Sequence, residues 1–314
     1  MNRVALQVII PIYHPDEKFI ELLNMLKKQS IPDIPVLIID SASDKEWCKA
    51  AQGLNWQLKD IDSKDFNHGG TRQMGIDMCP GKDIIVFLTQ DAILADEYSI
   101  ENLVRAFDDI SVGCAYGRQL PHKDANVFAA FTRLHNYPAQ SYIRSYEDRN
   151  VYGMKTAFLS NSFSAYRRTA MEKVGGFPSN VILSEDMYVA AKMLMSGWKV
   201  AYVAEAKVYH SHNYTIWQEF KRYFDIGVFH ARESWIRKNM GEAEGNGKNF
   251  VGNEIKYLLD RNPFFICEMI VRDGMKFLGY RLGIEEYILP DAFKRNISMN
   301  WRFFGEYVCS FCDS

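Results

Sequence analysis

Residues 83–92 read Asp83-Ile84-Ile85-Val86-Phe87-Leu88-Thr89-Gln90-Asp91-Ala92, an apolar run that ends abruptly in an acid. Five consecutive apolar residues between polar ones predict a buried strand of an α/β sheet. A carboxylate at the carboxyl end of such a strand does little for stability, but it lies where the crevice above the sheet binds ligands. A second apolar run, residues 36–39, ends the same way in Asp40. Two strand-end acids in this part of the chain predict a nucleotide-binding site.

Strand and helix patterns alternate in the first part of the sequence. Apolar runs predict strands at residues 4–12, 36–39 and 84–88, and apolar residues at helical spacing predict helices at 16–29 and 71–78. Because parallel strands are joined by helical crossovers, this order predicts a mostly parallel sheet with helices on both faces. The pattern is typical of a Rossmann-like α/β fold.

The following part of the chain is less regular. Residues 121–157 are polar and aromatic without a clear period, which suggests a long excursion near the predicted site. A helix at 184–195 stands out, because Ser184 can cap its first turn and Gly197 can end it. Shorter elements are expected as strands at 112–116, 162–166, 199–203 and 207–209 and as a helix at 167–174.

The C-terminal part, after about residue 215, is helical in pattern. Between residues 264 and 278 an apolar stripe recurs at helical spacing opposite a charged one, which predicts an amphipathic helix. The apolar positions are Phe264, Cys267, Val271, Met275 and Leu278, and the charged positions are Glu268, Arg272, Asp273 and Lys276. The Gly-rich residues 241–250 predict a flexible break before this helix.

The composition is that of a folded protein without a strongly charged partner. With 47% hydrophobic and 24% charged residues, the 314-residue chain fits one large domain or two unequal ones. A net charge of −2 gives no support to nucleic-acid binding, which usually requires a basic excess. The sequence shows neither a run of about 18 uncharged apolar residues nor a signal-peptide pattern, so we expect no membrane span and no secretion.

The six cysteines occur without framework spacing, which is compatible with reduced thiols in a cytoplasm. Cys309 and Cys312 form a C-x-x-C pair near the end of the sequence. Because no second ligand pair lies nearby, we interpret this pair as a tail feature rather than a zinc site.

Two segments near the predicted strand ends could contact a nucleotide. Asp40 and Ser41 could hydrogen-bond a base or a ribose, although an acid–hydroxyl turn would use the same residues. In residues 66–72, Phe-Asn-His-Gly-Gly-Thr-Arg, the glycines let the backbone approach a ligand and the helix start favours an anion. Arg72 adds a cation to this segment. A plain Gly-rich turn before a helix explains it equally well, so both interpretations stay open.

Asp91 and two histidines could form a metal site. Diphosphate leaving groups need charge neutralisation, usually by a divalent metal held on carboxylates, and Asp91 is suitably placed to hold one. Gln90 beside it is neutral and adds at most an amide contact. His210 follows a predicted strand, and His212 falls on the same face if that strand continues. Against this, a lone histidine is usually no ligand, and a strand that ends in a turn accounts for Asp91 alone.

Glu185 and Asp186 open the predicted helix at 184–195. The helix dipole favours acids in the first turn, which is a purely structural explanation. A catalytic base would be equally well placed there, with its carboxylate directed into the cleft. The pair alone therefore does not distinguish between these two roles.

The order and spacing of all these groups together are more specific than any one of them. From Val8-Ile9-Ile10-Pro11-Ile12-Tyr13 through His212, the chain resembles family 2 glycosyltransferases of the GT-A fold. It is most similar to the bacterial rhamnosyltransferases that build O-antigen and capsular polysaccharides. The segments that carry the closer similarity are residues 39–44, 66–72, 87–92 and 220–227, the last reading Phe-Lys-Arg-Tyr-Phe-Asp-Ile-Gly.

The resemblance implies a role for each group. Asp186 resembles the catalytic base of the family's E-D motif, in which Glu185 precedes it. Asp91 resembles the last acid of the D-x-D element that binds metal and diphosphate, and His210 resembles the histidine that completes the metal site in some members. Gln90 stands where many members have Asp, and it matches the rhamnosyltransferase-like subgroup. The residues that the resemblance assigns to nucleotide-sugar binding are Asp40, Ser41, His68, Gly69, Gly70, Arg72, Gln90 and Asp91.

The resemblance also implies a reaction and its partners. The expected activity is an inverting transfer of L-rhamnose from dTDP-L-rhamnose to a lipid-linked oligosaccharide, with Mg²⁺ or Mn²⁺ as cofactor. Residues 1–215 would form the GT-A catalytic domain, and residues 216–314 a helical region that contacts acceptor, membrane or another subunit. The protein would be cytoplasmic, peripheral to the inner face of the cell membrane, and a homo-oligomer stays open.

Two other functions remain open from the sequence. A catalytically silent nucleotide-sugar-binding or assembly subunit would explain Gln90, but a pure binder has no use for a base at Asp186. A nucleotidyltransferase would need a Gly- and Lys-rich phosphate loop near the start of the sequence. Residues 11–15, Pro-Ile-Tyr-His-Pro, do not form one.

Overall fold

The computed structural model describes residues 5–241 and 245–305, which belong to two compact units. Unit 1 comprises Met1–Ser179 and Glu185–His212 and carries the β-sheet. Unit 2 comprises Asn180–Ser184 and Asn213–Ser314 and carries the C-terminal helices. The C-x-x-C pair at Cys309 and Cys312 lies outside the described residues.

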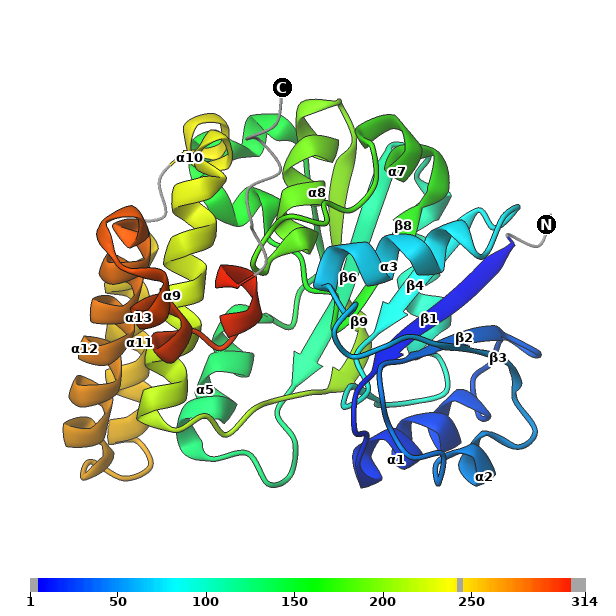
Figure 1. Cartoon of the computed structure of the whole chain (residues 1–314), viewed down its shortest axis with the longest axis horizontal. Helices are drawn as coiled ribbons and strands as arrows, with labels where there is room; N and C mark the ends of the chain where they lie inside the picture. The colour runs from blue at the N-terminus through cyan, green and yellow to red at the C-terminus, as the bar shows by residue number, and fades with distance from the viewer. Residues whose placement is uncertain (1–4, 242–244, 306–314) are drawn as a thin grey trace. The chain divides into compact units, whose positions relative to one another are not determined.

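Unit 1 is built on one mixed sheet (Figure 1). Its strands are β1 (Leu6–Ile12), β2 (Pro35–Asp40), β3 (Asn55–Asp60), β4 (Ile84–Leu88), β5 (Ile93–Leu94), β6 (Val112–Leu120), β7 (Tyr142–Arg144), β8 (Phe163–Arg167) and β9 (Lys199–Tyr209). They lie in the order β3-β2-β1-β4-β8-β6-β9-β5, and β7 pairs with β9. Strands β3, β2, β1 and β4 are parallel to one another, as are β6 and β9, whereas β8 runs antiparallel to both of its neighbours.

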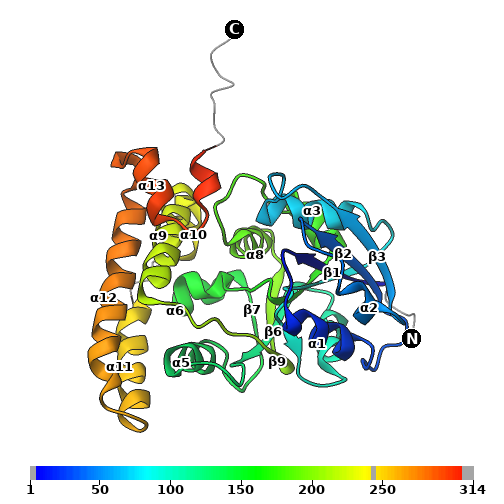
Figure 2. The ribbon, with the colours of Figure 1, turned by 60° about the horizontal axis from the view of Figure 1, so that its bottom comes forward.

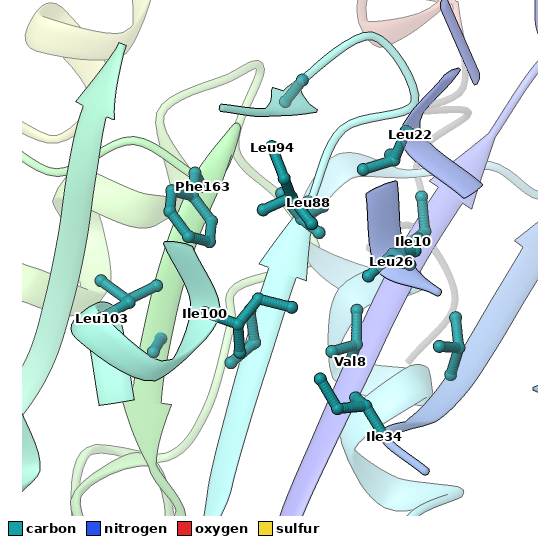
Figure 3. Close-up of a cluster of buried hydrophobic side chains, with 14 of the residues drawn as sticks. Val8, Ile10, Leu22, Leu26, Ile34, Leu88, Leu94, Ile100, Leu103 and Phe163 are labelled. Carbon is teal, nitrogen blue, oxygen red and sulfur yellow. The ribbon is translucent and has the colours of Figure 1, made fainter. Parts of the chain in front are cut away.

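Helices cover both faces of this sheet, as the sequence predicts. They are α1 (Glu17–Leu26), α2 (Cys48–Ala51), α3 (His68–Asp77), α4 (Ser99–Arg105), α5 (Val127–Asn136), α6 (Arg149–Tyr152), α7 (Arg168–Val174) and α8 (Glu185–Met195). Alternate residues of β1 show the division between the faces. Val8 and Ile10 belong to the apolar core that α1 covers with Leu22 (Figure 3). Ile9 points the other way, where a side chain on Gly75 of α3 would meet it at 3.0 Å.

The strand directions gather several chain segments at one edge of the sheet. Because β8 is antiparallel to both β4 and β6, these two strands point the same way, and β1, β2 and β9 point with them. The amino end of β8 lies at the same edge. In open α/β sheets this edge, beyond the carboxyl ends of the parallel strands, is where ligands bind. The segments that converge there follow Ile12, Asp40, Leu88, Leu120 and Tyr209 and precede Phe163.

The structure corrects the sequence-based expectations for unit 1 in three places. The edge strand β3 is missed because its sequence, Asn-Trp-Gln-Leu-Lys-Asp, is mostly polar, and only Trp56 and Leu58 pack, half-buried, against the core. Residues 121–157 are not an irregular excursion, since they contain α5, β7 and α6. The two strands expected at 199–203 and 207–209 are one strand, β9, whose register against β6 shifts between Val203 and Lys207.

Unit 2 contains α9 (Ile216–Arg232), α10 (Ser234–Met240), α11 (Gly245–Leu259), α12 (Phe265–Ile284) and α13 (Asp291–Ile297), and α9, α11 and α12 lie side by side (Figure 2). The predicted break at 241–250 is too long, because α11 already begins at Gly245. A side chain at Gly279 or Gly283 of α12 would meet a backbone oxygen of α9 at 2.4 Å or 2.1 Å, so glycine allows the two helices to approach closely. Within the described residues, no helix is both long and apolar enough to cross a membrane.

Helix α12 turns its charged positions inward and its apolar stripe outward. Arg272 and Lys276 are buried, whereas Phe264, Ile270 and Phe277 are 89%, 62% and 68% exposed. An amphipathic helix on a soluble protein usually has the opposite orientation, with the apolar stripe against the core. Helix α12 is therefore amphipathic as predicted, but its charged side faces unit 2 and its apolar side faces outward.

In the part of the chain that the structure describes, the acidic and basic residues of unit 2 differ in their exposure. Most acidic side chains are buried or partly buried, whereas most exposed charged residues are basic. The exposed basic residues are Arg222, Arg232, Lys238, Lys256, Arg261, Arg281, Arg295 and Arg302, and the exposed acidic ones are Asp260 and Asp291. The described surface of this unit is therefore basic, although acids and bases are balanced in its sequence.

Candidate active site

Asp91 follows β4 in a turn and meets two histidines that follow β9. His210 Nε2 lies 3.5 Å, and His212 Nδ1 3.6 Å, from Asp91 Oδ2. One ligand atom from each of the three side chains lies within 4.8 Å of those of the other two. The strand directions explain the cluster, because β4 and β9 both end at the ligand-binding edge of the sheet. His212, which the sequence leaves as an open possibility, thus joins the two predicted metal ligands.

A hydrogen-bond chain orients His210 towards Asp91. The side-chain oxygen of buried Gln119 accepts a hydrogen bond from Arg133 Nη1 at 2.8 Å and lies 2.9 Å from His210 Nδ1. Because a carbonyl oxygen can only accept, His210 donates from Nδ1. Its Nε2 is then left to face the carboxylate of Asp91. Holding a histidine through its second nitrogen in this way is typical of metal ligands.

The Asp91 cluster fits a divalent cation. Ligand atoms about 2.1 Å from one ion lie roughly 3 to 3.5 Å apart, close to the separations between Asp91 and the two histidines. A carboxylate and two imidazoles are ordinary ligands of divalent transition metals. His122 supports the turn that carries Asp91, because its Nε2 lies 3.1 Å from the Asp91 backbone oxygen.

Asn161 positions the two acids that begin α8. Its backbone N–H donates to Asp186 Oδ2 at 3.0 Å, and its side-chain amide donates to Glu185 Oε1 at 2.8 Å. The side-chain oxygen of Asn161 accepts hydrogen bonds from Ser164 and Tyr166 of β8, so the asparagine is itself fixed. Since Asn161 precedes β8, this places the Glu185–Asp186 pair at the same edge of the sheet as Asp91.

Glu185 forms a buried ion pair with Arg72. The Arg72 Nη1 atom lies 3.1 Å from Glu185 Oε1, and both side chains are only 6% exposed. Burial alone would raise the pKa of Glu185, but the charge of Arg72 and the hydrogen bond from Asn161 lower it below the usual value. Glu185 therefore stays ionised. Arg72 is committed to this pair, so its placement does not support a direct contact with a diphosphate.

The pKa of Asp186 is shifted the opposite way. Burial raises it, and the negative charge of neighbouring Glu185 raises it further, to about 7. Two adjacent carboxyl groups thus have pKa values pushed apart, which is how proteins separate a fixed charge from a titrating acid or base. A carboxylate that gains and loses a proton near neutral pH suits general base catalysis.

The backbone before this pair is in an unusual conformation. Ser184 has a φ of 59°, in the left-handed region, whereas a helix N-cap residue is extended. This conformation does not support the predicted capping role of Ser184. A non-glycine residue in this region costs about 1 kcal/mol or more, and such strain is often found at functional sites.

Asp40 closes β2 and is completely buried. One of its oxygens accepts from the Ser43 backbone at 2.9 Å, and the other accepts from the Ser43 hydroxyl and the Lys45 ammonium. Ser41 ties the ends of β1 and β2 by donating its N–H and its hydroxyl to the Ile12 oxygen. The acid–hydroxyl turn is thus present. A nucleotide contact by Asp40 would have to include or displace Lys45.

The predicted Gly-rich segment is the first turn of α3. The helix begins at His68, earlier than the expected start at residue 71, and Asn67 caps it by accepting from Gly70 N at 2.8 Å. A side chain at Gly69 would lie 1.8 Å from the backbone oxygen of Pro178. Glycine is therefore required at 69 by close packing, which favours the structural explanation for this segment.

Gln90 uses its whole amide on the backbone of Tyr13. Its Oε1 accepts from Tyr13 N at 2.7 Å, and its Nε2 donates to Tyr13 O at 3.1 Å. The side chain thereby joins the loop after β1 to the turn that carries Asp91. This contact gives Gln90 a positioning role for which an acid would lack the donor.

Several residues at this edge escape sequence-based prediction. Gln119 lies on β6 beyond the expected end of that strand at residue 116, and His122 follows the same strand. Asn161 precedes β8 between two serines, and this polar triplet before an apolar strand is the signal that could have found it.

The sheet order, the strand-edge acids and the Asp91 cluster define a GT-A glycosyltransferase. The model of the Glycosyl transferase family 2 matches residues 7–175, more than half of the chain. This chain belongs to glycosyl transferase family 2, and it is an enzyme that transfers a sugar.

Two curated relatives match along almost the whole chain. The O-antigen chain rhamnosyltransferase RfbN of Salmonella typhimurium is 48% identical over 297 residues, which cover 94% of this chain and 95% of that protein. The O-antigen chain rhamnosyltransferase WbaN of Salmonella anatum is 43% identical over 293 residues, which cover 93% of each.

Solved structures confirm the GT-A fold. The mannosyltransferase PcManGT from Pyrobaculum calidifontis, in complex with GDP-Man and Mn²⁺, matches with a TM-score of 0.56 at 17% identity, covering 96% of this chain and 84% of that one. S. aureus TarS residues 1–349 match with a TM-score of 0.55 at 14% identity, covering 94% and 83%. At these identities the likeness concerns the fold alone.

Proposed function

We propose that this chain transfers L-rhamnose from dTDP-L-rhamnose to a lipid-linked oligosaccharide during O-antigen synthesis. The observation that carries the proposal is the identity of 48% and 43% to two O-antigen chain rhamnosyltransferases over nearly the full length of both proteins. The Asp91 cluster and the Glu185–Asp186 pair support the proposal, because they would supply the metal ligands and the base that an inverting transfer requires.

Asp186 is the general base of the proposed reaction. Its carboxylate takes the proton of an acceptor hydroxyl while the hydroxyl oxygen bonds to the anomeric carbon and the bond from that carbon to the diphosphate breaks. Attack opposite the leaving group inverts the configuration. Asn161 holds the carboxylate through Oδ2, and Glu185, kept ionised by Arg72, raises its proton affinity.

We assign the metal to Asp91, His210 and His212. A bound divalent cation would neutralise the charge that develops on the departing nucleotide diphosphate. Two imidazoles favour Mn²⁺ over Mg²⁺, because Mg²⁺ prefers oxygen ligands. The mannosyltransferase of similar fold was solved with Mn²⁺ and GDP-Man, which is consistent with this choice.

The donor contacts are assigned to the ends of β2 and β4 and the start of α3. Asp40 and Ser41 would contact the base, with Lys45 beside them, and His68 with Gly70 would border the sugar nucleotide. Gln90 and Arg72 would act indirectly, through the Tyr13 backbone and through Glu185.

A lipid-linked acceptor places the proposed enzyme at the cytoplasmic face of the cell membrane.

The competing hypothesis of a catalytically silent subunit loses its main support. Gln90, which suggested a lost metal site, instead holds the Tyr13 backbone, and the acid pair at Glu185 and Asp186 keeps the features of a base.

A donor panel tests the proposal. Purified protein is assayed with Mn²⁺, a lipid-linked acceptor and dTDP-L-rhamnose, UDP-glucose, UDP-galactose or GDP-mannose. We expect dTDP-L-rhamnose to give a kcat/KM at least about tenfold above the others, with a product of inverted anomeric configuration. A preference for UDP-glucose or UDP-galactose would refute the donor, and no transfer or hydrolysis of any donor would favour the silent subunit.

A further inference from the structure

The outward side of α12 carries a continuous apolar surface. Its members, which we call the α12 stripe, are Phe264, Cys267, Ile270, Val271, Phe277 and Leu278, and all are exposed. Phe264, Cys267, Val271 and Leu278 follow one another at spacings of three, four and seven residues, and Ile270 and Phe277 are seven apart, so all six lie along one side of the helix over about 20 Å. The exposed apolar area is on the order of 500 Å², at the upper end for a monomeric protein, where it usually marks an interaction site.

The stripe cannot be buried by turning the helix. The opposite side of α12 is packed on α9 through Gly279 and Gly283, whose neighbours leave no room for another side chain. Arg272 lies 3.1 Å from Glu219 of α9 in a buried ion pair. Rotation of α12 would break this pair and leave buried charges without partners, which is strongly destabilising. The outward stripe is therefore a fixed feature of unit 2.

Further apolar side chains are exposed before and after the stripe in the sequence. Leu259 precedes it, and Tyr287 and Ile288 of the turn η4 (Glu286–Ile288) follow it. Next to the stripe the charges balance, because Asp260 and Arg261 are both exposed near its start and Arg281 pairs with Glu285 at 3.3 Å near its end. The described part of unit 2 as a whole exposes eight basic side chains and two acidic ones. An apolar surface on a unit with an excess of exposed bases complements a bilayer with anionic headgroups.

We infer that the α12 stripe docks this protein on an anionic lipid surface, with α12 lying along the headgroup region. The inference deepens the proposed function by naming the surface that brings the enzyme to a lipid-linked acceptor. It rests on the proposed function only for the reason that the protein binds a membrane. Eight basic and two acidic side chains are exposed in the described part of unit 2, and this excess of bases attracts an anionic lipid surface and disfavours a second copy of the same unit.

Vesicle flotation of the full-length chain tests the inference. Vesicles of phosphatidylethanolamine and phosphatidylglycerol are compared with vesicles of phosphatidylcholine alone. The triple variant Phe264→Ser/Ile270→Ser/Phe277→Ser should bind the anionic vesicles at least about tenfold more weakly than the wild type. The control is Ile110→Ser/Val151→Ser in unit 1, whose side chains are 81% and 76% exposed, and it should bind like the wild type. Because all five side chains are exposed, each variant should fold.

Three results decide the inference. It is overturned if the wild type does not bind anionic vesicles at low salt, or if the triple variant binds as tightly as the wild type. Sedimentation velocity provides the third: a wild-type dimer that the triple variant converts to a monomer, with no change in vesicle binding, would assign the stripe to a second copy.

A water-soluble acceptor separates this inference from the proposed function. Docking through α12 predicts that the triple variant keeps its turnover with a short soluble acceptor and loses it with the lipid-linked one. If neither the wild type nor the triple variant transfers rhamnose but vesicle binding still depends on the stripe, then the proposed reaction is wrong and the docking surface is still supported.

Discussion

Asp186 of unit 1 and Glu254 of unit 2 both have a pKa raised to about 7, yet their surroundings differ. In both cases burial is the main cause. Asp186 begins α8 at the sheet edge, where Asn161 holds one of its oxygens. Glu254 lies within α11, is 1% exposed, and its Oε2 has no hydrogen-bond partner among the described residues. A shifted pKa alone therefore does not point to a base, and the proposed role of Asp186 depends on its position at the sheet edge as well.

The buried charges around these two acids also serve different ends. In unit 1, Arg72 holds Glu185 ionised, and the charge of Glu185 adds to the effect of burial in raising the pKa of Asp186. In unit 2, Arg272 and Lys276 cross from α12 to Glu219 of α9 and join the two helices. The charges around Asp186 thus shift the pKa of a group that titrates, whereas the charges between α9 and α12 hold α12 with its apolar side outward.

The largest expected difference between the two acids is in catalysis. Asp186→Asn should lower the rate of rhamnose transfer by about 100-fold or more, because the acceptor hydroxyl loses its proton acceptor. Glu254→Gln should leave the rate within about twofold. Initial rates of dTDP release measure both, with circular dichroism to confirm folding. Near-normal turnover by folded Asp186→Asn would remove the base assignment.

The two buried arginines extend the comparison. Arg72→Met leaves the buried acid Glu185 without its counter-charge and should lower the free energy of unfolding by about 3 kcal/mol. Arg272→Met leaves Glu219 with Lys276 alone, at 3.8 Å, and should lower the free energy of unfolding by less. Per folded molecule, only Arg72→Met should also slow transfer, because Glu185, which lies next to the proposed base Asp186, loses the ion pair that keeps it in place and ionised. Chemical denaturation together with rates corrected for the folded fraction checks this. Equal loss of activity in both variants would contradict the separation of the two networks.

A smaller effect is expected at the metal ligands. Gln119→Leu should weaken Mn²⁺ binding by about 10- to 100-fold, because His210 loses the partner that orients it. Gln29→Leu is the matched control, since Gln29 is also buried but hydrogen-bonds the backbone of Met25, Asp96 and Ile100 and none of the three proposed metal ligands. Calorimetric titration of Mn²⁺ into the protein without donor gives both affinities. Unchanged affinity in Gln119→Leu would argue against His210 as a ligand.

Local patterns in the sequence were enough to predict the parallel strands β1, β2 and β4 and the acids that follow β2 and β4. The apolar runs that end in Asp40 and Asp91 are buried strands, and the direction of a parallel strand places its end residue at the ligand-binding edge. The antiparallel strand β8 could not be placed in this way, because its pairing with β4 and β6 depends on distant residues. Asn161, at its start, was missed for that reason.

The orientation of side chains was beyond the sequence as well. The pattern of α12 predicts an amphipathic helix, but period alone does not tell which side faces the core, and here buried ion pairs with α9 decide it. Likewise the spacing around Arg72 is compatible with an anion site, and only tertiary contact with Glu185 shows that its charge is already used. Long-range charge pairing is what sequence periodicity leaves out.

The dependence of kcat/KM on pH tests the central claim, that Glu185 leaves Asp186 as a base that titrates near neutrality. Asp186 must be deprotonated to act, so kcat/KM should rise about tenfold per pH unit below 7 and level off above it. Glu185→Gln removes the neighbouring charge and should move the midpoint to lower pH, whereas Glu254→Gln should leave it in place. A profile that is flat from pH 5 to pH 8, or a midpoint that Glu185→Gln does not move, would contradict the account.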